Sequence, residues 1–326
     1  MQSNERSHAG ARIALVDVAR GVALVAMAVY HFTWDLEFFG YVPAGMPNEG
    51  GWRLFARLIA SSFLFLVGFS LVLAHGRGIR WWSFWKRWAT VAGGAALVTV
   101  ATWFAINDSF VFFGILHEIA LASILGLAFL RVPPLLTLTV AAAVFTLPLV
   151  FSSVVFDTPR LWWVGLSTFL PRSMDFVPVF PWFAAVLAGI AAGRAARSYG
   201  ILPKLAAIAT PRWAWPLDLA GRHSLLVYLV HQPVLLGALA LFNLVWPPAV
   251  DRSPETFLSE CSRVCSDTRG APFCERYCGC MLNEIVVADR LDEVFDRSQN
   301  TETRRWVGEL AGQCTALAET APEEGQ

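Results

Sequence analysis

Long apolar stretches separated by short polar connections fill the first 250 residues of the chain. Seven stretches reach membrane-spanning length, near 13–33, 54–74, 88–106, 110–130, 133–151, 178–196 and 224–246. A helix of about 20 apolar residues is long enough to cross the hydrocarbon core of a bilayer. The pattern therefore predicts an all-α, polytopic membrane bundle of about seven spans over residues 12–250, after a short tail at 1–11.

The pattern changes after Pro247 and Pro248. Helix-like patterns of mixed polarity follow at 255–266, 272–297 and 301–319. None of them is a continuous apolar run of spanning length, so residues 251–326 are expected to form a small, soluble, helical C-terminal region. We refer to residues 251–326 as the tail.

Composition supports this division of the chain. Hydrophobic residues make up 56% of the sequence, which contains 14 Trp and 24 Phe, and the mean hydropathy is +0.52. Residues 1–250 carry 17 Lys and Arg against 10 Asp and Glu, whereas residues 251–326 carry 8 against 15. The zero net charge thus hides a basic membrane part and an acidic tail.

The basic residues also predict an orientation. Lys and Arg gather in the connections 75–87 and 194–222 and ahead of the first span, whereas the alternate connections hold most of the acids outside the spans. Basic loops stay in the cytoplasm. The first span lacks a small-residue cleavage site and should be retained. We expect a multi-pass protein of the inner (cytoplasmic) membrane, with a cytoplasmic N-terminus and a periplasmic or extracellular tail.

All six cysteines lie in the tail, where an even number indicates disulfides formed in an oxidising compartment. The segments CSRVC and CERYC each place two sulfurs on one helical face. Two such helices folded back on each other favour the bridges Cys261–Cys278 and Cys265–Cys274, which leaves Cys280 and Cys314 for a third. Zinc binding is the rival interpretation, but the tail contains no histidine and the spacing is loose, so no metal is expected.

Ionisable side chains interrupt the first span on one side of its helix. Arg20 and His31 are eleven positions apart, which is close to three turns and about 16 Å along the axis. Asp17 lies one turn before Arg20 and can neutralise it. Asp35 lies one turn after His31 and can accept a hydrogen bond that orients the imidazole. A structural ion pair and an interfacial histidine are the simpler alternatives.

Two further histidines fall inside expected spans. His117 stands beside Glu118, and His231 has Tyr228 one turn before it and Gln232 after it. Hydrogen bonding between helices and packing around a kinked helix would explain either histidine without catalysis. Because His31, His117 and His231 fall at outer or central depths of three different helices, they are expected to converge on one site.

Four segments resemble a known family. RIALVDVARGVALVAMAVYH, at 12–31, resembles the first helix of the transmembrane acyltransferase superfamily, in which an Arg is followed ten residues later by a His. VDVARG, FLFLVGFSLVLA at 63–74, FFGILHEIALASILGL at 112–127 and GRHSLLVYLVHQPVL at 221–235 are similar to the heparan-alpha-glucosaminide N-acetyltransferase catalytic-domain family. The resemblance covers about residues 11–246 and excludes the tail.

The resemblance implies transfer of an acyl group, expected to be acetyl, from cytoplasmic acyl-CoA to a hydroxyl or amine on the outer side. An envelope glycan is the expected acceptor, and acetyl-CoA or another acyl-CoA is the co-substrate. His31, oriented by Asp35, would be the base, with His117 and His231 positioning the thioester carbonyl or the acceptor. Arg20, paired with Asp17, would help to hold the donor. Transfer through an acyl-histidine also remains open.

Two other functions remain open. A proton-coupled transporter would use the same intramembrane charges, although the chain lacks an evident internal repeat. A membrane scaffold would use its Cys-rich tail to bind an envelope protein partner. The lipid bilayer is expected to surround the protein in every case, and nothing in the sequence indicates nucleic-acid binding.

Overall fold

The computed structural model describes residues 13–43, 45–76, 78–248, 252–266, 268–295 and 300–320. Within these residues it contains thirteen α-helices and short 3-10 turns, and the only strand-like pairing is an isolated bridge between Phe113 and Phe176. The all-α prediction is confirmed. The expected N-terminal tail, 1–11, lies outside the described residues.

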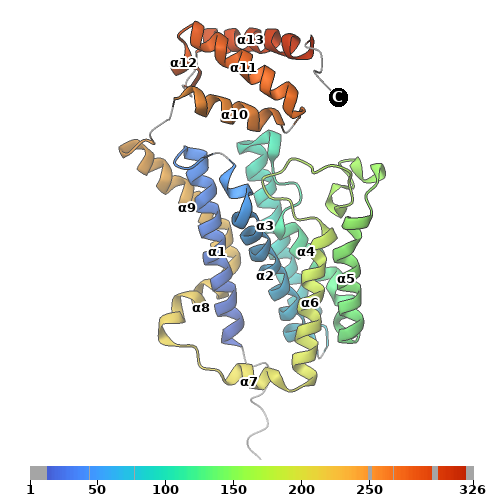
Figure 1. Ribbon diagram of the computed structural model, residues 1–326. Helices are drawn as coiled ribbons and strands as arrows, with labels where there is room; N and C mark the ends of the chain where they lie inside the picture. The colour runs from blue at the N-terminus through green and yellow to red at the C-terminus, as the bar shows by residue number, and fades with distance from the viewer. Residues whose placement is uncertain are drawn as a thin grey trace, which may run out of the picture. The chain divides into compact units, whose positions relative to one another are not determined.

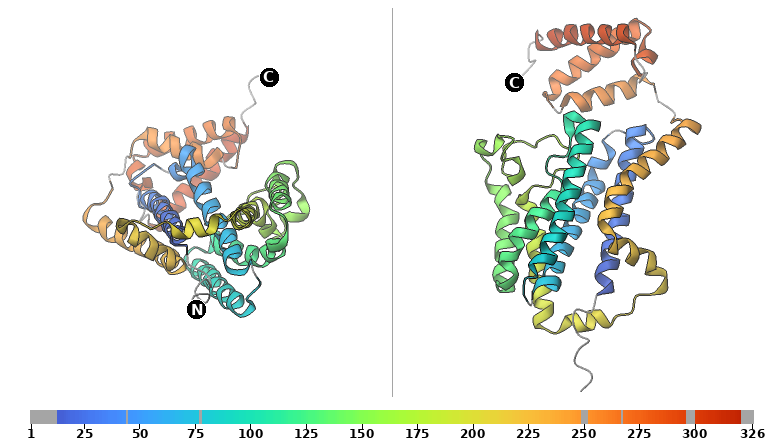
Figure 2. Two further views of the ribbon diagram at one scale, coloured as in Figure 1. Left: turned by 90° about the horizontal axis from the view of Figure 1, so that it is seen from below. Right: turned by 180° about the vertical axis from the view of Figure 1, so that it is seen from behind.

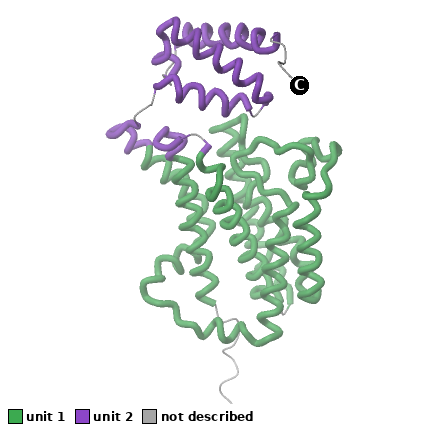
Figure 3. The backbone as a smooth tube through the Cα atoms, viewed as in Figure 1, with its two compact units in different colours: residues 1–35, 46–239 green, residues 36–45, 240–326 purple. Residues whose placement is uncertain are grey.

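The chain separates into two compact units, which Figure 3 colours differently and which we describe one by one. Unit 1 comprises residues 1–35 and 46–239, and unit 2 comprises residues 36–45 and 240–326. The functional division predicted from the sequence, 12–250 and 251–326, stays a prediction.

Unit 1 is a bundle of long helices, several of which are seen nearly end-on in Figure 2. In the order of Figure 1, the helices that build it are α1 (Ala14–Phe39), α2 (Gly50–His75), α3 (Trp81–Ala105), α4 (Ile115–Leu127), α5 (Pro134–Val150), α6 (Val179–Ser198), α7 (Ile201–Ala207), α8 (Trp215–Arg222) and α9 (Ser224–Val245). The last residues of α1 and α9 belong to unit 2.

Five of these helices, α1, α2, α3, α6 and α9, are long and apolar enough to cross a membrane. Two expected spans are shorter than predicted. Helix α4 has 13 residues, because the chain before it is extended and the Val177 amide donates to the Phe113 carbonyl. Helix α5 has 17 residues and begins only at Pro134. A straight helix of 13 residues covers about 20 Å of a core that is about 30 Å thick.

Helix α6 lies at the centre of the packing, between α2 and α5. It approaches α2 through glycines: a Cβ on Gly68 would overlap the Val186 carbonyl oxygen, and a Cβ on Gly189 would overlap that of Phe65. Small residues let two membrane helices approach closely enough for backbone contact. The side chains buried beside this crossing include Leu64, Val72, Leu187 and Ile190.

Helix α1 meets α8 through a second pair of glycines. A Cβ on Gly21 would overlap the carbonyl oxygen of Leu217, and one on Gly221 would overlap that of Asp17. These contacts hold the first turns of α1, which carry Asp17 and Arg20, against α8.

Unit 2 contains the tail helices α10 (Pro254–Ser266), α11 (Ala271–Val287), α12 (Leu291–Phe295) and α13 (Thr301–Thr320). Three disulfides join them: Cys261–Cys278 and Cys265–Cys274 link α10 to α11, and Cys280–Cys314 links α11 to α13. The predicted bridges are confirmed. The small core contains Met281, Ile285 and Leu310, so covalent links supplement limited apolar burial.

Candidate functional site

Two histidines from opposite ends of the unit 1 sequence meet between α1 and α9. The Nδ1 atom of His31 lies 2.6 Å from the Nε2 atom of His231, and the rings stack with centroids 4.9 Å apart. Nδ1 of His231 lies 2.6 Å from the Tyr228 carbonyl oxygen, one turn earlier on α9. The three groups form a hydrogen-bonded chain.

The Tyr228 carbonyl determines which nitrogens of the two histidines carry protons. A carbonyl oxygen only accepts hydrogen bonds, so Nδ1 of His231 carries the proton. With both imidazoles neutral, Nε2 of His231 is then an acceptor and Nδ1 of His31 is its donor. Nε2 of His31 is left with a lone pair and has no hydrogen-bond partner among the described residues. Such an atom can accept a proton from a bound molecule.

Asp35 and Gln232 form a second pair beside the histidines. The Gln232 side-chain nitrogen donates to Oδ1 of Asp35 at 2.5 Å, and the Asp35 side chain is buried. The other carboxylate oxygen, Oδ2, and the Gln232 amide oxygen are buried with no hydrogen-bond partner in the described part of the chain. Two hydrogen-bond acceptors are thus unused beside the histidine pair. Gln232 follows His231 in sequence, and Asp35 lies one turn after His31.

The expected hydrogen bond from His31 to Asp35 is therefore wrong. His31 instead pairs with His231, and Asp35 pairs with Gln232. Because α9 carries the better-placed partners across the interface, both polar residues of α1 bond between helices rather than along their own helix.

Tyr228 connects this cluster to the start of α4. Its hydroxyl lies 3.5 Å from Oδ2 of Asp175, and the same carboxylate oxygen accepts the Ile115 amide at 2.8 Å. Asp175, in the connection before α6, thus satisfies one of the free amides at the N-terminus of α4. Burial raises the pKa of the Asp175 carboxyl, and the two hydrogen bonds act in the opposite direction. A Cβ on Gly114 would overlap this carboxylate.

His117 does not join the other two histidines. Its Nδ1 accepts the Gly114 amide at 3.2 Å, and its Nε2 lies 3.1 Å from the Thr99 hydroxyl, which itself donates to the Val111 carbonyl at 2.7 Å. Both ring nitrogens are occupied at the start of α4. The expected convergence of three imidazoles is thus found for His31 and His231 alone.

Glu118, next to His117, is fully buried, and neither carboxyl oxygen has a hydrogen-bond partner among the described residues.

Arg20 lies at the other end of α1 in a polar contact with α2. Its Nη1 donates to Asp17 at 2.8 Å, and its Nη2 lies 2.5 Å from the hydroxyl of Ser70, a buried residue of α2. The expected pairing of Asp17 with Arg20 is confirmed. The Arg20 side chain is 19% exposed, so it links two helices while part of it stays accessible.

Two residues of these networks carried no sequence signal. Asp175 lies in an irregular connection, and Ser70 is one of three serines in an otherwise largely apolar helix. Only their contacts with residues distant in sequence reveal them. His75 is buried and accepts the Arg80 amide at 3.2 Å.

Comparison with protein families adds one finding. The family model described as heparan-alpha-glucosaminide N-acetyltransferase, catalytic, matches residues 12–233. This range contains the histidine pair, Asp35, Gln232 and Arg20, and it excludes the tail. No curated protein and no solved structure gives a significant match to the chain.

Proposed function

The chain belongs to the heparan-alpha-glucosaminide N-acetyltransferase catalytic family, and from this we propose that it transfers an acetyl group from cytoplasmic acetyl-CoA to an acceptor on the outer side of the membrane. The histidine pair is the observation that carries the proposal. Family membership supports an acetyltransferase, and five apolar helices support a multi-pass membrane protein.

His31 is the proposed general base. The nitrogen or oxygen of the acceptor attacks the thioester carbonyl carbon, the carbon–sulfur bond breaks, and coenzyme A leaves with the electron pair. The proton lost by the acceptor passes to Nε2 of His31 and then to the leaving sulfur, so the products are the acetylated acceptor and CoA thiol. His231 holds His31 in the required tautomer and shares the positive charge while the proton is held.

An amine is the acceptor group that fits the unused atoms best. Oδ2 of Asp35, the Gln232 amide oxygen and Nε2 of His31 are all hydrogen-bond acceptors. An amine offers several N–H donors, and an ammonium group also offers a positive charge for the carboxylate, whereas a hydroxyl offers one donor. A glycan that carries an amino sugar would supply this group.

Arg20, with Asp17, is proposed to orient the donor from the inner side. Arg20 lies about 16 Å from His31 along α1. The extended pantetheine arm of CoA can bridge this distance. His117 is proposed to act indirectly, because its two nitrogens hold the start of α4 and thereby the Asp175–Tyr228 contact.

The proposed sidedness, with a cytoplasmic N-terminus and an exported tail, follows from the basic connections and the disulfides. Five long helices, or seven if α4 and α5 also cross, give an odd number in either case. A reporter fused after residue 326 should be active only outside the cytoplasm, and one inserted near Arg80 only inside. A cytoplasmic tail would contradict the proposal.

Release of CoA thiol by the purified protein tests the activity. All six cysteines are bridged, so a thiol reagent added under non-reducing conditions reports CoA rather than the protein. Acetyl-CoA should be consumed faster with glucosamine than with glucose, because only glucosamine carries the amine. Solute movement across liposomes without acetyl-CoA consumption would point to the transporter instead.

A further inference from the structure

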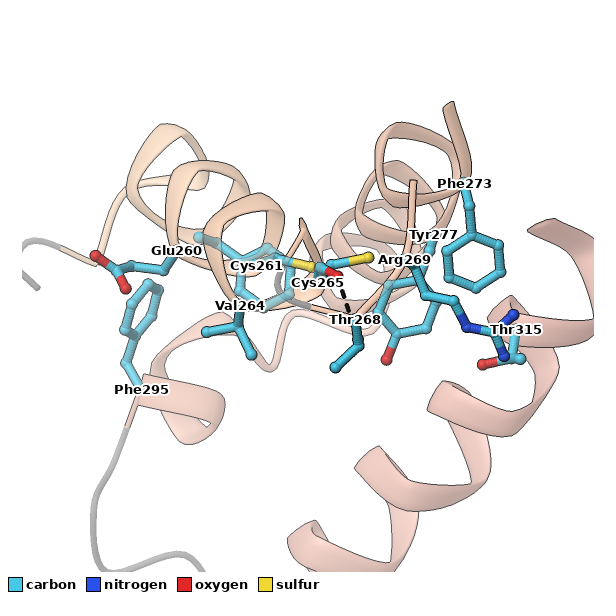
Figure 4. Close-up of a pocket in the computed structure, with 11 residues that line it drawn as sticks. Glu260, Cys261, Val264, Cys265, Thr268, Arg269, Phe273, Tyr277, Phe295 and Thr315 are labelled. Carbon is cyan, nitrogen blue, oxygen red and sulfur yellow. Dashed lines mark hydrogen bonds between the residues drawn. The ribbon is translucent and has the colours of Figure 1, made fainter. Parts of the chain in front are cut away.

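The tail contains a groove that has no part in the proposed acetyl transfer. Its volume is about 520 Å³, within the range of about 300–1,000 Å³ that is common for ligand sites. Figure 4 shows Glu260 and Phe295 at one end, Arg269, Phe273 and Thr315 at the other, and Cys261 and Cys265 between them. All the lining residues belong to unit 2.

Covalent bonds hold this groove in shape. The bridges Cys261–Cys278 and Cys265–Cys274 fasten α10 to α11, and Cys261 and Cys265 themselves line the groove. The third bridge fastens α13, which supplies Thr315, to α11. A site that is already rigid loses little conformational entropy when a ligand binds.

Aromatic rings line both ends. At one end Phe257 meets Phe295 edge to face, with centroids 6.4 Å apart. At the other, the rings of Phe273 and Tyr277 are nearly parallel, with 10° between their planes, and the Arg269 guanidinium covers one face of Phe273 at 4.9 Å from its centroid. All four rings are partly exposed. Flat, partly exposed rings offer apolar surfaces to ligands whose own faces are apolar.

The polar groups around the rings carry little net charge. Arg269 pairs with Glu319 at 3.2 Å, and Glu260 pairs with Arg263 at 2.8 Å. The hydroxyl of Tyr277 has no hydrogen-bond partner among the described residues. The groove therefore combines apolar ring faces, a free hydroxyl and ion pairs whose charges cancel, which does not favour a strongly charged ligand.

We propose that this groove binds an uncharged segment of a glycan. Each pyranose ring has an apolar C–H face that can lie on an aromatic side chain, and edges with hydroxyls that can bond to Tyr277, Arg269 and Glu260. The inference rests on the proposed function, because the tail would then hold the acceptor glycan of the acetyltransferase. It adds a binding site outside the family-matched residues, 12–233.

Calorimetric titration of the full-length protein in nanodiscs, without acetyl-CoA, tests this site. The probes are chitotetraose and cellotetraose as neutral glycans, a hyaluronan tetrasaccharide as an anionic glycan, and a basic amphipathic helical peptide. We expect a neutral glycan to bind best. Tyr277→Phe, which removes only the hydroxyl, should weaken that binding about fivefold, and Phe273→Ala should weaken it more.

Val287→Ala is the matched control, because Val287 lies on the same helix, is 75% exposed and is not part of the groove. It should leave binding unchanged. Intact bridges, mapped by mass spectrometry without reduction, would show that the variants are folded.

Absence of neutral-glycan binding by the fully oxidised protein, or tighter binding of the peptide or of hyaluronan, would overturn the proposal. Acetyl transfer to free glucosamine is measured separately. Loss of that activity would count against the proposed function, whereas its persistence without glycan binding would count against the groove alone.

Discussion

The hydrogen-bonded chain from Tyr228 to His31 predicts unequal effects for its two histidines. His31→Ala removes the proposed base and should slow acetyl transfer by about 10²–10⁴-fold. His231→Ala removes the hydrogen bond that Nδ1 of His31 donates to Nε2 of His231, together with the bond from His231 to the Tyr228 carbonyl. The His31 ring is charged while it holds the proton of the acceptor, and a hydrogen bond from a charged group contributes about 1.5–3 kcal/mol, or about 10–150-fold in rate. His231→Ala should therefore be milder than His31→Ala.

Conservative replacements sharpen the comparison. Glutamine in His231→Gln offers an amide oxygen that can accept the Nδ1 proton of His31, so this variant should keep more activity than His231→Ala. Glutamine in His31→Gln cannot accept a proton at neutral pH, so this variant should be as slow as His31→Ala. The double alanine variant should be no slower than His31→Ala, because His231 is proposed to act through His31.

The assay is the initial rate of CoA thiol release at saturating acetyl-CoA, with folded yield followed by size-exclusion chromatography. His223→Ala, at the start of the helix that carries His231, is the matched control and should have a near-normal rate. Equal losses for the two single variants, with multiplied losses in the double variant, would refute the assigned order. A near-normal rate for folded His31→Ala would exclude this residue as the base.

Gly68→Ala should lower the melting temperature of the detergent-solubilised protein, because the added Cβ overlaps the backbone of α6 and overpacking costs about 1–3 kcal/mol. Gly93→Ala is the control and should leave the melting temperature unchanged, because the space around its Cβ is open. Arg20→Lys should keep the positive charge opposite Asp17 but lose the forked contact that also reaches Ser70. Acetyl transfer should therefore slow while the folded yield stays normal. An unchanged rate of acetyl transfer would indicate that Arg20 has a structural role only. Replacing both Cys280 and Cys314 with serine opens a loop whose ends are 34 residues apart. This should lower the folding stability of the tail by about 4 kcal/mol and so speed its cleavage by a protease. Cleavage at the rate of the unmodified protein would contradict this.

Several features of the protein follow from local sequence patterns. The length of the apolar stretches predicts where spanning helices lie, because backbone groups in lipid must be satisfied within a helix. Helical spacing places Asp17 beside Arg20, and the two C-x3-C pairs predict which sulfurs can meet. Each of these relations connects residues on one helix or on two helices joined by a short turn, so helix geometry alone determines them.

The candidate site depends on contacts that no local pattern contains. Spacing places His31 and Asp35 on one face of α1, but it does not say which helix lies opposite. The structure brings His231 and Gln232 to that face, and it occupies His117 at the start of α4. A polar side chain in a helical bundle takes the partner that packing brings within reach. The sequence therefore determined the candidate residues, and the tertiary structure decided which of them form hydrogen bonds with one another.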